Sequence, residues 1–315
     1  MTLSAGLLFS DRIEALLDGR VSPAGAPLAI RCMEAQALFR SVLREAAWDV
    51  AELSMGSWIA AVAAGKREYL GLPVFPSRAF RHANLYVRTD RIRAPEDLIG
   101  KTIGVIDFQQ TAALWVRGLL ADEHGVAREG IRWVAAGLHA PVLTDRAALS
   151  MPPGIQLSRS PDTLDALLRR GEIDAAISPA APRCFADPDV PVDRMWPDFA
   201  AAQLDWWRRT RLFPIMHVLV VRRSLAEAGP ALPAALVAAF TEALAMAVRD
   251  LHARDFPKLA LPTQYAAAAE ARGAYGPDLW TYGLDPNRSV LETTLRYAEA
   301  DGLTCGGLSP EDLFA

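Results

Sequence analysis

The chain has 315 residues, of which 51% are apolar and 22% are charged, and its formal net charge is -4 at pH 7. This composition is that of an ordinary soluble globular protein, and the length favours two compact lobes over one large core. The scattered basic residues give no broad positive surface, which excludes nucleic acid and an anionic membrane as expected partners.

The first 90 residues alternate short apolar runs with amphipathic segments. That alternation is typical of strands joined by helical crossovers in a parallel sheet. The expected elements are strands at 3–9, 27–33 and 49–57, a helix at 34–47 and a pair of strands within 69–90.

A second unit of the same kind follows a crossing at 90–100. Ser160 is the expected N-cap of a helix that begins with Pro161 and stops at Gly171. The other expected elements are a strand and a helix within 101–126, strands at 131–137, 173–179 and 217–223, a loop at 138–160, a helix at 233–253 and a helical tail.

This order predicts an α/β protein of two lobes, with the second inserted into the first. Residues 1–90 and 200–315 form the expected first lobe, and residues 91–199 form the second. The chain order is that of type II periplasmic binding proteins, in which each lobe is a mainly parallel sheet flanked by helices.

The compartment is predicted from the N-terminus and the cysteines. The first residues lack a positively charged start and a small-residue cleavage site, and Cys32, Cys184 and Cys305 form no CxxC pair. The uncharged run at 53–65 is 13 residues long, short of the roughly 20 that span a bilayer. We expect a cytoplasmic protein without membrane insertion.

Polar and small residues follow the expected strands at four places. Ligands in open parallel sheets bind beyond the carboxyl ends of the strands, where helix N-termini offer free N–H groups. Helix capping alone would explain any single position equally well. The candidate binding residues are Ser10, Ser54, Met55, Gly56, Gln110, Thr111 and Pro179.

The segment FPSRAFRH contains the densest group of candidate ligand-binding side chains. Ser77, Arg78, Arg81 and His82 supply a hydroxyl, two guanidinium groups and an imidazole. A guanidinium pairs bidentately with a carboxylate. In an extended strand, Arg78 and His82 point to one side and Arg81 to the other, so one ligand meets all three only if the strand bends. Pairing of the arginines with surface carboxylates is the alternative interpretation.

A second group lies at 204–217, where Trp206, Trp207 and Phe213 precede His217. These rings would suit a flat aromatic ligand, although a tryptophan pair is more often part of a core. The histidines form no HxxxH or HEXXH pattern, so no metal site is predicted. A metal site that folding would assemble from His82, His217 and Glu52 is kept as an open alternative. Walker, nucleophile-elbow and dinucleotide motifs are also missing from the sequence.

At these residues the sequence resembles the 4,5-dihydroxyphthalate decarboxylase family. The matching pieces include DVAELSMGSW, PVFPSRAFRHANLYV, GEIDAAISP, RRTRLFPIMHVLVVRR and the tail LETTLRYAEADGLTCGGLSPEDLFA. The sequence departs from that pattern at Trp206 and Trp207, where tyrosines are usual, and at Arg211, where glycine is usual.

The resemblance implies a cofactor-independent lyase that removes CO2 from a hydroxylated aromatic carboxylic acid, such as 4,5-dihydroxyphthalate, giving protocatechuate. On this hypothesis Arg78 and Arg81 hold a carboxylate, Ser54 and Thr111 add hydroxyl donors, and His82 or His217 protonates the ring.

Two other functions suit the same fold. One is a non-catalytic solute-binding or sensor protein for an aromatic carboxylate, and the other is a biosynthetic enzyme acting on a different ligand. A homo-oligomer is compatible with an enzyme of the decarboxylase class.

Overall fold

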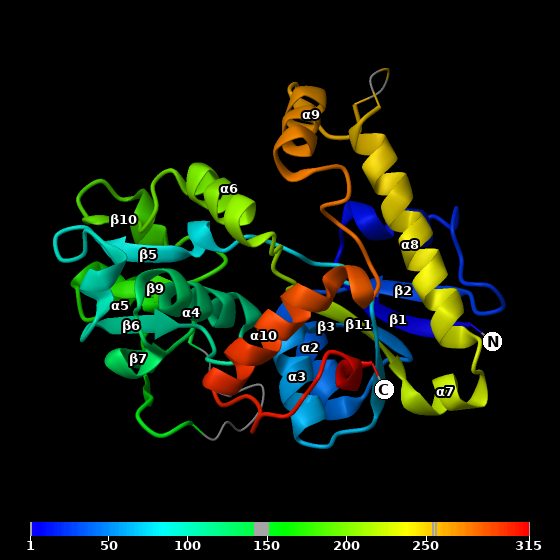
Figure 1. The fold of residues 1–315 in the computed structure, drawn as a ribbon, viewed down its shortest axis with the longest axis horizontal. Coiled ribbons are helices and arrows are strands. Elements are labelled where there is room, and N and C mark those ends of the chain that lie inside the picture. Colours follow the sequence, from blue (N-terminus) through cyan, green and yellow to red (C-terminus); the bar gives the residue numbers. More distant parts are fainter. Residues whose placement is uncertain (1, 142–150, 254, 256, 315) are drawn as a thin grey trace.

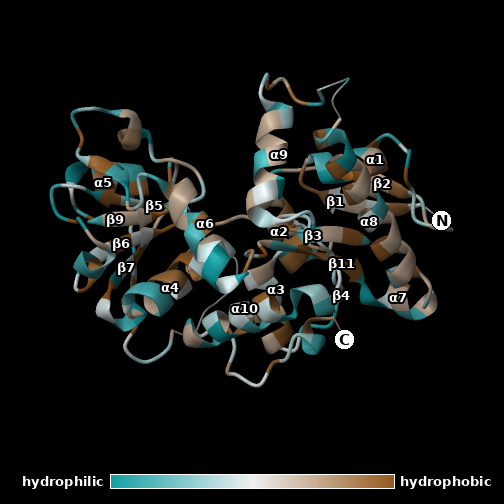
Figure 2. Ribbon diagram, turned by 45° about the horizontal axis from the view of Figure 1, so that its top comes forward, coloured by the Kyte–Doolittle hydropathy of each residue, from teal (hydrophilic) through white to brown (hydrophobic). Residues whose placement is uncertain are grey.

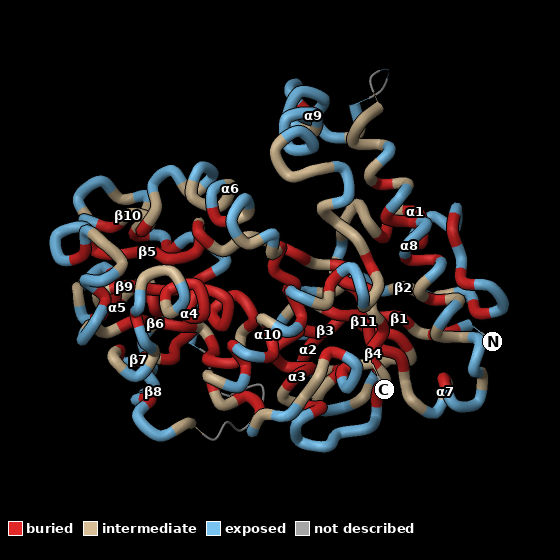
Figure 3. The backbone as a smooth tube through the Cα atoms, in the orientation of Figure 1, coloured by how far each residue is buried: buried red, intermediate tan, exposed pale blue. Residues whose placement is uncertain are grey.

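The computed structural model describes residues 2–141, 151–253, 255 and 257–314. It consists of two lobes, each built on one sheet with helices against its faces (Figure 1). The central strands of each sheet are mostly apolar (Figure 2) and buried (Figure 3), whereas the edge strands β2 (Leu28–Cys32) and β8 (Gln156–Arg159) are largely exposed. The predicted two-lobed α/β class is confirmed.

The sheet of the first lobe has five strands in the order β2-β1-β3-β11-β4. β1, β2 and β3 are parallel, whereas β11 runs antiparallel to both of its neighbours. β11 therefore begins at the edge where β1 and β3 end. The strands are β1 (Leu3–Leu7), β2 (Leu28–Cys32), β3 (Val50–Ser54), β4 (Tyr69–Leu72) and β11 (His217–Arg222).

The sheet of the second lobe has six strands in the order β10-β5-β9-β6-β7-β8, with β5 antiparallel to both neighbours. The expected boundary at residue 90 put β5 in the first lobe, but its hydrogen bonds place it in this sheet. The strands are β5 (Leu85–Arg88), β6 (Thr102–Val105), β7 (Arg132–Ala135), β8 (Gln156–Arg159), β9 (Ala175–Ile177) and β10 (Val192–Arg194).

Several elements differ from the sequence expectation. α5 begins after Thr163, whose side chain accepts the Ala166 N–H, so the predicted cap at Ser160 was wrong. β8 lies inside the expected loop, α3 begins within the strand expected at 49–57, and α1, α6 and α7 had not been singled out. The helices are α1 (Glu14–Leu17), α2 (Ala35–Glu45), α3 (Met55–Ala63), α4 (Thr111–His124), α5 (Leu164–Arg170), α6 (Phe199–Thr210), α7 (Arg223–Ala228), α8 (Leu232–Leu251), α9 (Gln264–Tyr275) and α10 (Arg288–Ala300).

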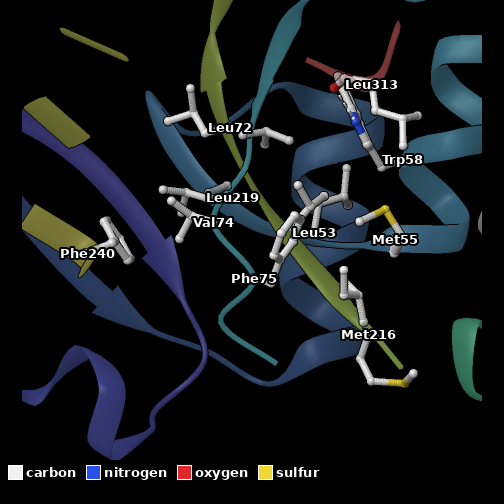
Figure 4. Close-up of a cluster of buried hydrophobic side chains, with 14 of the residues drawn as sticks. Leu53, Met55, Trp58, Leu72, Val74, Phe75, Met216, Leu219, Phe240 and Leu313 are labelled. Carbon is white, nitrogen blue, oxygen red and sulfur yellow. Dashed lines mark hydrogen bonds between the residues drawn. The ribbon is translucent and has the colours of Figure 1, made fainter. Parts of the chain in front are cut away.

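The core of the first lobe lies between its sheet and α3. Phe75 and Leu53 pack beside Met55 at the start of α3, as Figure 4 shows. Trp58 extends this core to the C-terminus, since its indole N–H donates to the Leu313 carbonyl at 3.0 Å. The final residues are thereby tied to the helix that begins at the end of β3.

α4 contributes to the cores of both lobes. Trp115 and Leu119 pack into the first core, while Val116 and Leu120 pack into the second. The same helix also carries a buried arginine, Arg117. It donates to Asp301, just after α10, at 2.9 Å, and Asp301 accepts from Arg128 at 2.6 Å as well. These contacts of α4 and Asp301 therefore hold the two lobes together, behind the edges at which the two sheets face each other.

α8 is long and apolar enough to cross a membrane by length and composition, with a mean hydropathy of 1.5 over 18 residues. One third of that window, 33%, is buried in the structure. Leu236, Phe240 and Leu244 form the inner face, which packs against α1 and the 3-10 turn Asp11–Ile13. This is the arrangement of a helix that covers a globular core.

Candidate active site

The carboxyl edges of the two sheets meet where α3 and α4 begin. Ser54 ends β3, and its hydroxyl lies 2.9 Å from the hydroxyl of Thr111, the first residue of α4. The Thr111 hydroxyl also accepts the Gly56 N–H at 2.9 Å. A Cβ on Gly56 would lie 2.5 Å from the Gln109 carbonyl, so this approach requires glycine. Two helix N-termini thus face the same point from opposite lobes.

His217 stands beside this point because β11 begins opposite Ser54 in the antiparallel ladder. Its Nδ1 lies 2.6 Å from the Glu52 carboxylate, and a carboxylate can only accept, so Nδ1 donates. The other Glu52 oxygen accepts the Leu8 N–H at 3.1 Å. Phe39 packs edge-on against the imidazole. Nε2 is left without a partner among the described residues.

Arg81 lies between the start of β11 and the second lobe. Its Nε donates to the Met216 sulfur at 3.0 Å, and another nitrogen donates to the Asn84 side chain at 3.0 Å. Asn84 in turn donates to the Pro179 carbonyl at 3.3 Å. None of the described carboxylates is within ion-pair distance of Arg81, and burial lowers its pKa to about 10. It is an uncompensated cation at the meeting of the lobes.

Further polar side chains near this point are enclosed without a hydrogen-bond partner in the described part of the chain. Enclosed polar groups in native proteins nearly always have a partner, so such a cluster marks a place for a bound molecule. The unpartnered atoms belong to Ser57 in the first turn of α3, to Gln109 and Gln110 before α4, and to Ser178 after β9.

Arg78 makes contacts within the chain that the sequence did not suggest. Its guanidinium donates to the Phe213 carbonyl at 2.6 Å and to the Asn287 side chain at 2.8 Å, and it stacks over the Phe213 ring. Burial lowers its pKa to about 9. One of its nitrogens donates to Thr281 and Asn287 in the C-terminal part of the chain and another to Phe213, so these contacts give it a structural role.

His82 occupies an apolar surrounding rather than the point where the helices meet. Its ring packs edge-on against Trp196 and Trp206, and its Nδ1 has no partner within the described residues. Burial, assisted by His124 and Arg209, lowers its pKa to about 4. The His82 ring is therefore neutral at pH 7.

Two of the remaining candidates contribute through their backbone. Ser77 accepts the Met216 and His217 N–H groups through its carbonyl, at 2.8 and 3.2 Å, and Met55 donates its N–H to the Met216 carbonyl. Ser77 and Met55 therefore fix the backbone around His217. Ser10 precedes a 3-10 turn that its hydroxyl does not cap.

No group of three or more His, Cys, Asp or Glu side chains that could hold a metal ion occurs among the described residues. The alternative metal site of His82, His217 and Glu52 is not formed, because of these three residues only His217 and Glu52 are in contact.

Comparison with known proteins identifies the family. No family model matches the chain. A 4,5-dihydroxyphthalate decarboxylase from Comamonas testosteroni is 40% identical over 307 residues, covering 96% of this chain and 93% of that protein. The chain belongs to the 4,5-dihydroxyphthalate decarboxylase family. A second member, from Pseudomonas putida, is 38% identical over 200 residues, covering 62% of this chain and 78% of that protein.

Solved structures outside the family share the fold. The periplasmic aliphatic sulphonate binding protein SsuA from Escherichia coli matches with a TM-score of 0.54 and 16% identity, covering all of this chain (100%) and 92% of that one. The desulfurization enzyme DSZB matches with a TM-score of 0.51 and 15% identity, covering 100% and 96% of the two chains. The predicted periplasmic-binding-protein-like fold is confirmed.

Proposed function

We propose that this protein decarboxylates 4,5-dihydroxyphthalate, giving protocatechuate and CO2, with the substrate bound where the two lobes meet. The observation that carries the proposal is the 40% identity, over 96% of the chain, to a protein of that name. The side chains described above provide the groups that such a reaction needs.

Arg81 is the proposed anchor of the carboxylate that stays on the ring. A half-buried guanidinium without a carboxylate partner is unfavourable on its own, and an anionic ligand would compensate its charge. The side chains of Gln109 and Ser178, which have no hydrogen-bond partner in the described part of the chain, can add neutral hydrogen bonds from the second lobe. This arrangement suits a small dianion such as a phthalate.

His217 is the proposed proton donor. Glu52 holds Nδ1 and fixes the orientation of the ring, which leaves Nε2 as the nitrogen that exchanges a proton. A positioned acid of this kind contributes roughly 10²- to 10⁴-fold to a rate.

The reaction then needs one proton transfer and one bond cleavage. Nε2 of the imidazolium gives its proton to the ring carbon that bears the departing carboxylate. The hydroxyl para to that carbon supplies electron density to the resulting cation. The electrons of the C–C bond return to the ring, CO2 leaves without charge, and the neutral imidazole regains a proton from solvent.

A panel of ring acids tests this function. The purified protein is incubated with 4,5-dihydroxyphthalate, phthalate and protocatechuate, and each mixture is followed by loss of CO2 and by thermal shift. We expect CO2 only from 4,5-dihydroxyphthalate, because phthalate lacks the para hydroxyl and protocatechuate lacks the second carboxylate. Thermal stabilisation by 4,5-dihydroxyphthalate without CO2 would indicate a binding or sensor protein instead.

A further inference from the structure

The segment between α9 and α10, coloured orange in Figure 1, returns from the projecting α9 to the first lobe. Three hydrogen bonds fix it there. The Trp280 indole donates to the Phe75 carbonyl at 3.1 Å, the Gly283 N–H donates to the Pro73 carbonyl at 2.7 Å, and Arg78 donates to the Thr281 carbonyl at 3.3 Å.

Asn287 closes the segment into a rigid loop. Its side chain donates to the carbonyls of Thr281 and Gly283, at 3.1 and 2.8 Å, while it accepts from Arg78. Arg78 forms an isolated bridge with Ile215, two residues before His217. The residue enclosed by these contacts, Tyr282, is therefore held next to the strand that carries His217.

The Tyr282 side chain is 9% exposed, and its hydroxyl oxygen has no hydrogen-bond partner among the described residues. A buried hydroxyl without a partner destabilises a protein, so a position that keeps one needs another reason. Arg12, which follows β1, stacks over the neighbouring Trp280 ring at 4.3 Å and donates to the Pro76 carbonyl at 2.8 Å. The segment that holds Tyr282 therefore lies at the sheet edge where His217 begins β11. Burial raises the pKa of the Tyr282 phenol, so the group is a neutral donor at pH 7.

We propose that Tyr282 is a specificity-determining residue whose hydroxyl binds the ring hydroxyl meta to the departing carboxylate. This inference rests on the proposed function. The para oxygen must release electron density into the ring during protonation, and a donor bound to it would oppose that release. The meta oxygen carries no charge in the reaction, so a neutral hydroxyl donor suits it.

The matched substrate is 4-hydroxyphthalate, which keeps the para hydroxyl required for the chemistry and lacks only the meta hydroxyl. We expect the wild-type protein to prefer 4,5-dihydroxyphthalate by at least about tenfold in kcat/KM, the worth of one buried hydrogen bond. In Tyr282→Phe, kcat/KM for 4,5-dihydroxyphthalate should fall about 10- to 100-fold, and kcat/KM for 4-hydroxyphthalate should change less than about threefold.

Tyr297→Phe is the control, because Tyr297 is also buried but its hydroxyl already donates to Asp122 at 2.6 Å between α10 and α4. Tyr297→Phe should lower the melting temperature without changing the ratio of the kcat/KM values for the two substrates. Tyr282→Phe should leave the melting temperature unchanged or raise it, because it removes an atom without a partner.

Equal kcat/KM for the two substrates in the wild-type protein, or an equal fall for both in Tyr282→Phe, would overturn the role of Tyr282 while the decarboxylase function stood. If the wild-type protein releases no CO2 from either substrate, the proposed function fails instead. In that case calorimetry still tests the hydrogen bond. The ratio of the Kd values of the two phthalates is then compared between the wild type and Tyr282→Phe.

Discussion

Nδ1 of His217 lies 2.6 Å from Oε1 of Glu52, joining the first residue of β11 to the middle of β3. The pair is formed by the register of the sheet, because antiparallel β11 begins where parallel β3 ends. An imidazole fixed in this way presents one defined nitrogen to a ligand.

Glu52→Gln tests the positioning role of this contact. The amide keeps the shape of the side chain but lets the imidazole adopt the other tautomer, so we expect kcat to fall by roughly 10²-fold with little change in KM. His217→Asn should lose at least as much. The pH profile of kcat should change shape in Glu52→Gln, and an unaltered kcat and profile would remove the carboxylate from the mechanism.

Replacement by glutamine should affect KM at Arg81 and stability at Arg78. Arg81→Gln removes a half-buried charge that has no carboxylate partner among the described residues, so its melting temperature should stay the same or rise, while KM rises on the order of 10- to 100-fold. Arg78→Gln breaks the bonds to Phe213 and Asn287 and should lower the free energy of unfolding by about 3 kcal/mol.

Urea denaturation and steady-state kinetics on both variants check this pair. Arg81→Lys should recover part of the KM, because it restores the charge without the fork of donors. A normal KM in Arg81→Gln would show that the carboxylate is held elsewhere.

His82 should make stability depend on pH. Its pKa is about 4 in the folded protein, against an ordinary 6.5, so the unfolded chain binds more protons between these values. The stability contribution is therefore fully present above pH 6.5 and is lost as the pH falls to 4, by at most about 3 kcal/mol. Urea titrations at pH 7.5, 6 and 5 should show a shallower decline in His82→Phe, and parallel curves for the two proteins would contradict this role.

Arg211 follows α6 with φ of 58°, a left-handed conformation that favours glycine. Arg211→Gly should raise the free energy of unfolding by about 0.5–1 kcal/mol, because it relieves this strain at some cost in entropy. Gly125 ends α4 at φ of 64° with open space around its Cα, so Gly125→Ala should lose about 1 kcal/mol. Thermal unfolding of both checks the signs, and a less stable Arg211→Gly would mean that the contact with the Trp207 ring matters more.

The meeting of Ser54 with Thr111 could be predicted from the sequence, because both residues follow strands whose ends face each other in this fold. The family and the lobes could also be predicted, since the matching pieces run in order along nearly the whole chain. His217 was recognisable as a residue at the start of a strand.

The roles of Arg78, Arg81 and His82 could not be separated in this way. The alternation argument assumed a strand, but the segment makes one isolated bridge at Arg78 and then a 3-10 turn, His82–Asn84. Asn84 and Tyr282 had not been singled out at all. Tyr282 is about 200 residues from its neighbours in the first lobe, and only the tertiary structure brings it to them.

The central claim is that the protein breaks a carbon–carbon bond of 4,5-dihydroxyphthalate rather than only binding it. The most direct test is incubation in D2O, with CO2 quantified and the products read by proton and carbon NMR. We expect one CO2 for each protocatechuate, with deuterium at the carbon that lost its carboxylate. Recovery of unchanged 4,5-dihydroxyphthalate from a protein that binds it would contradict the account.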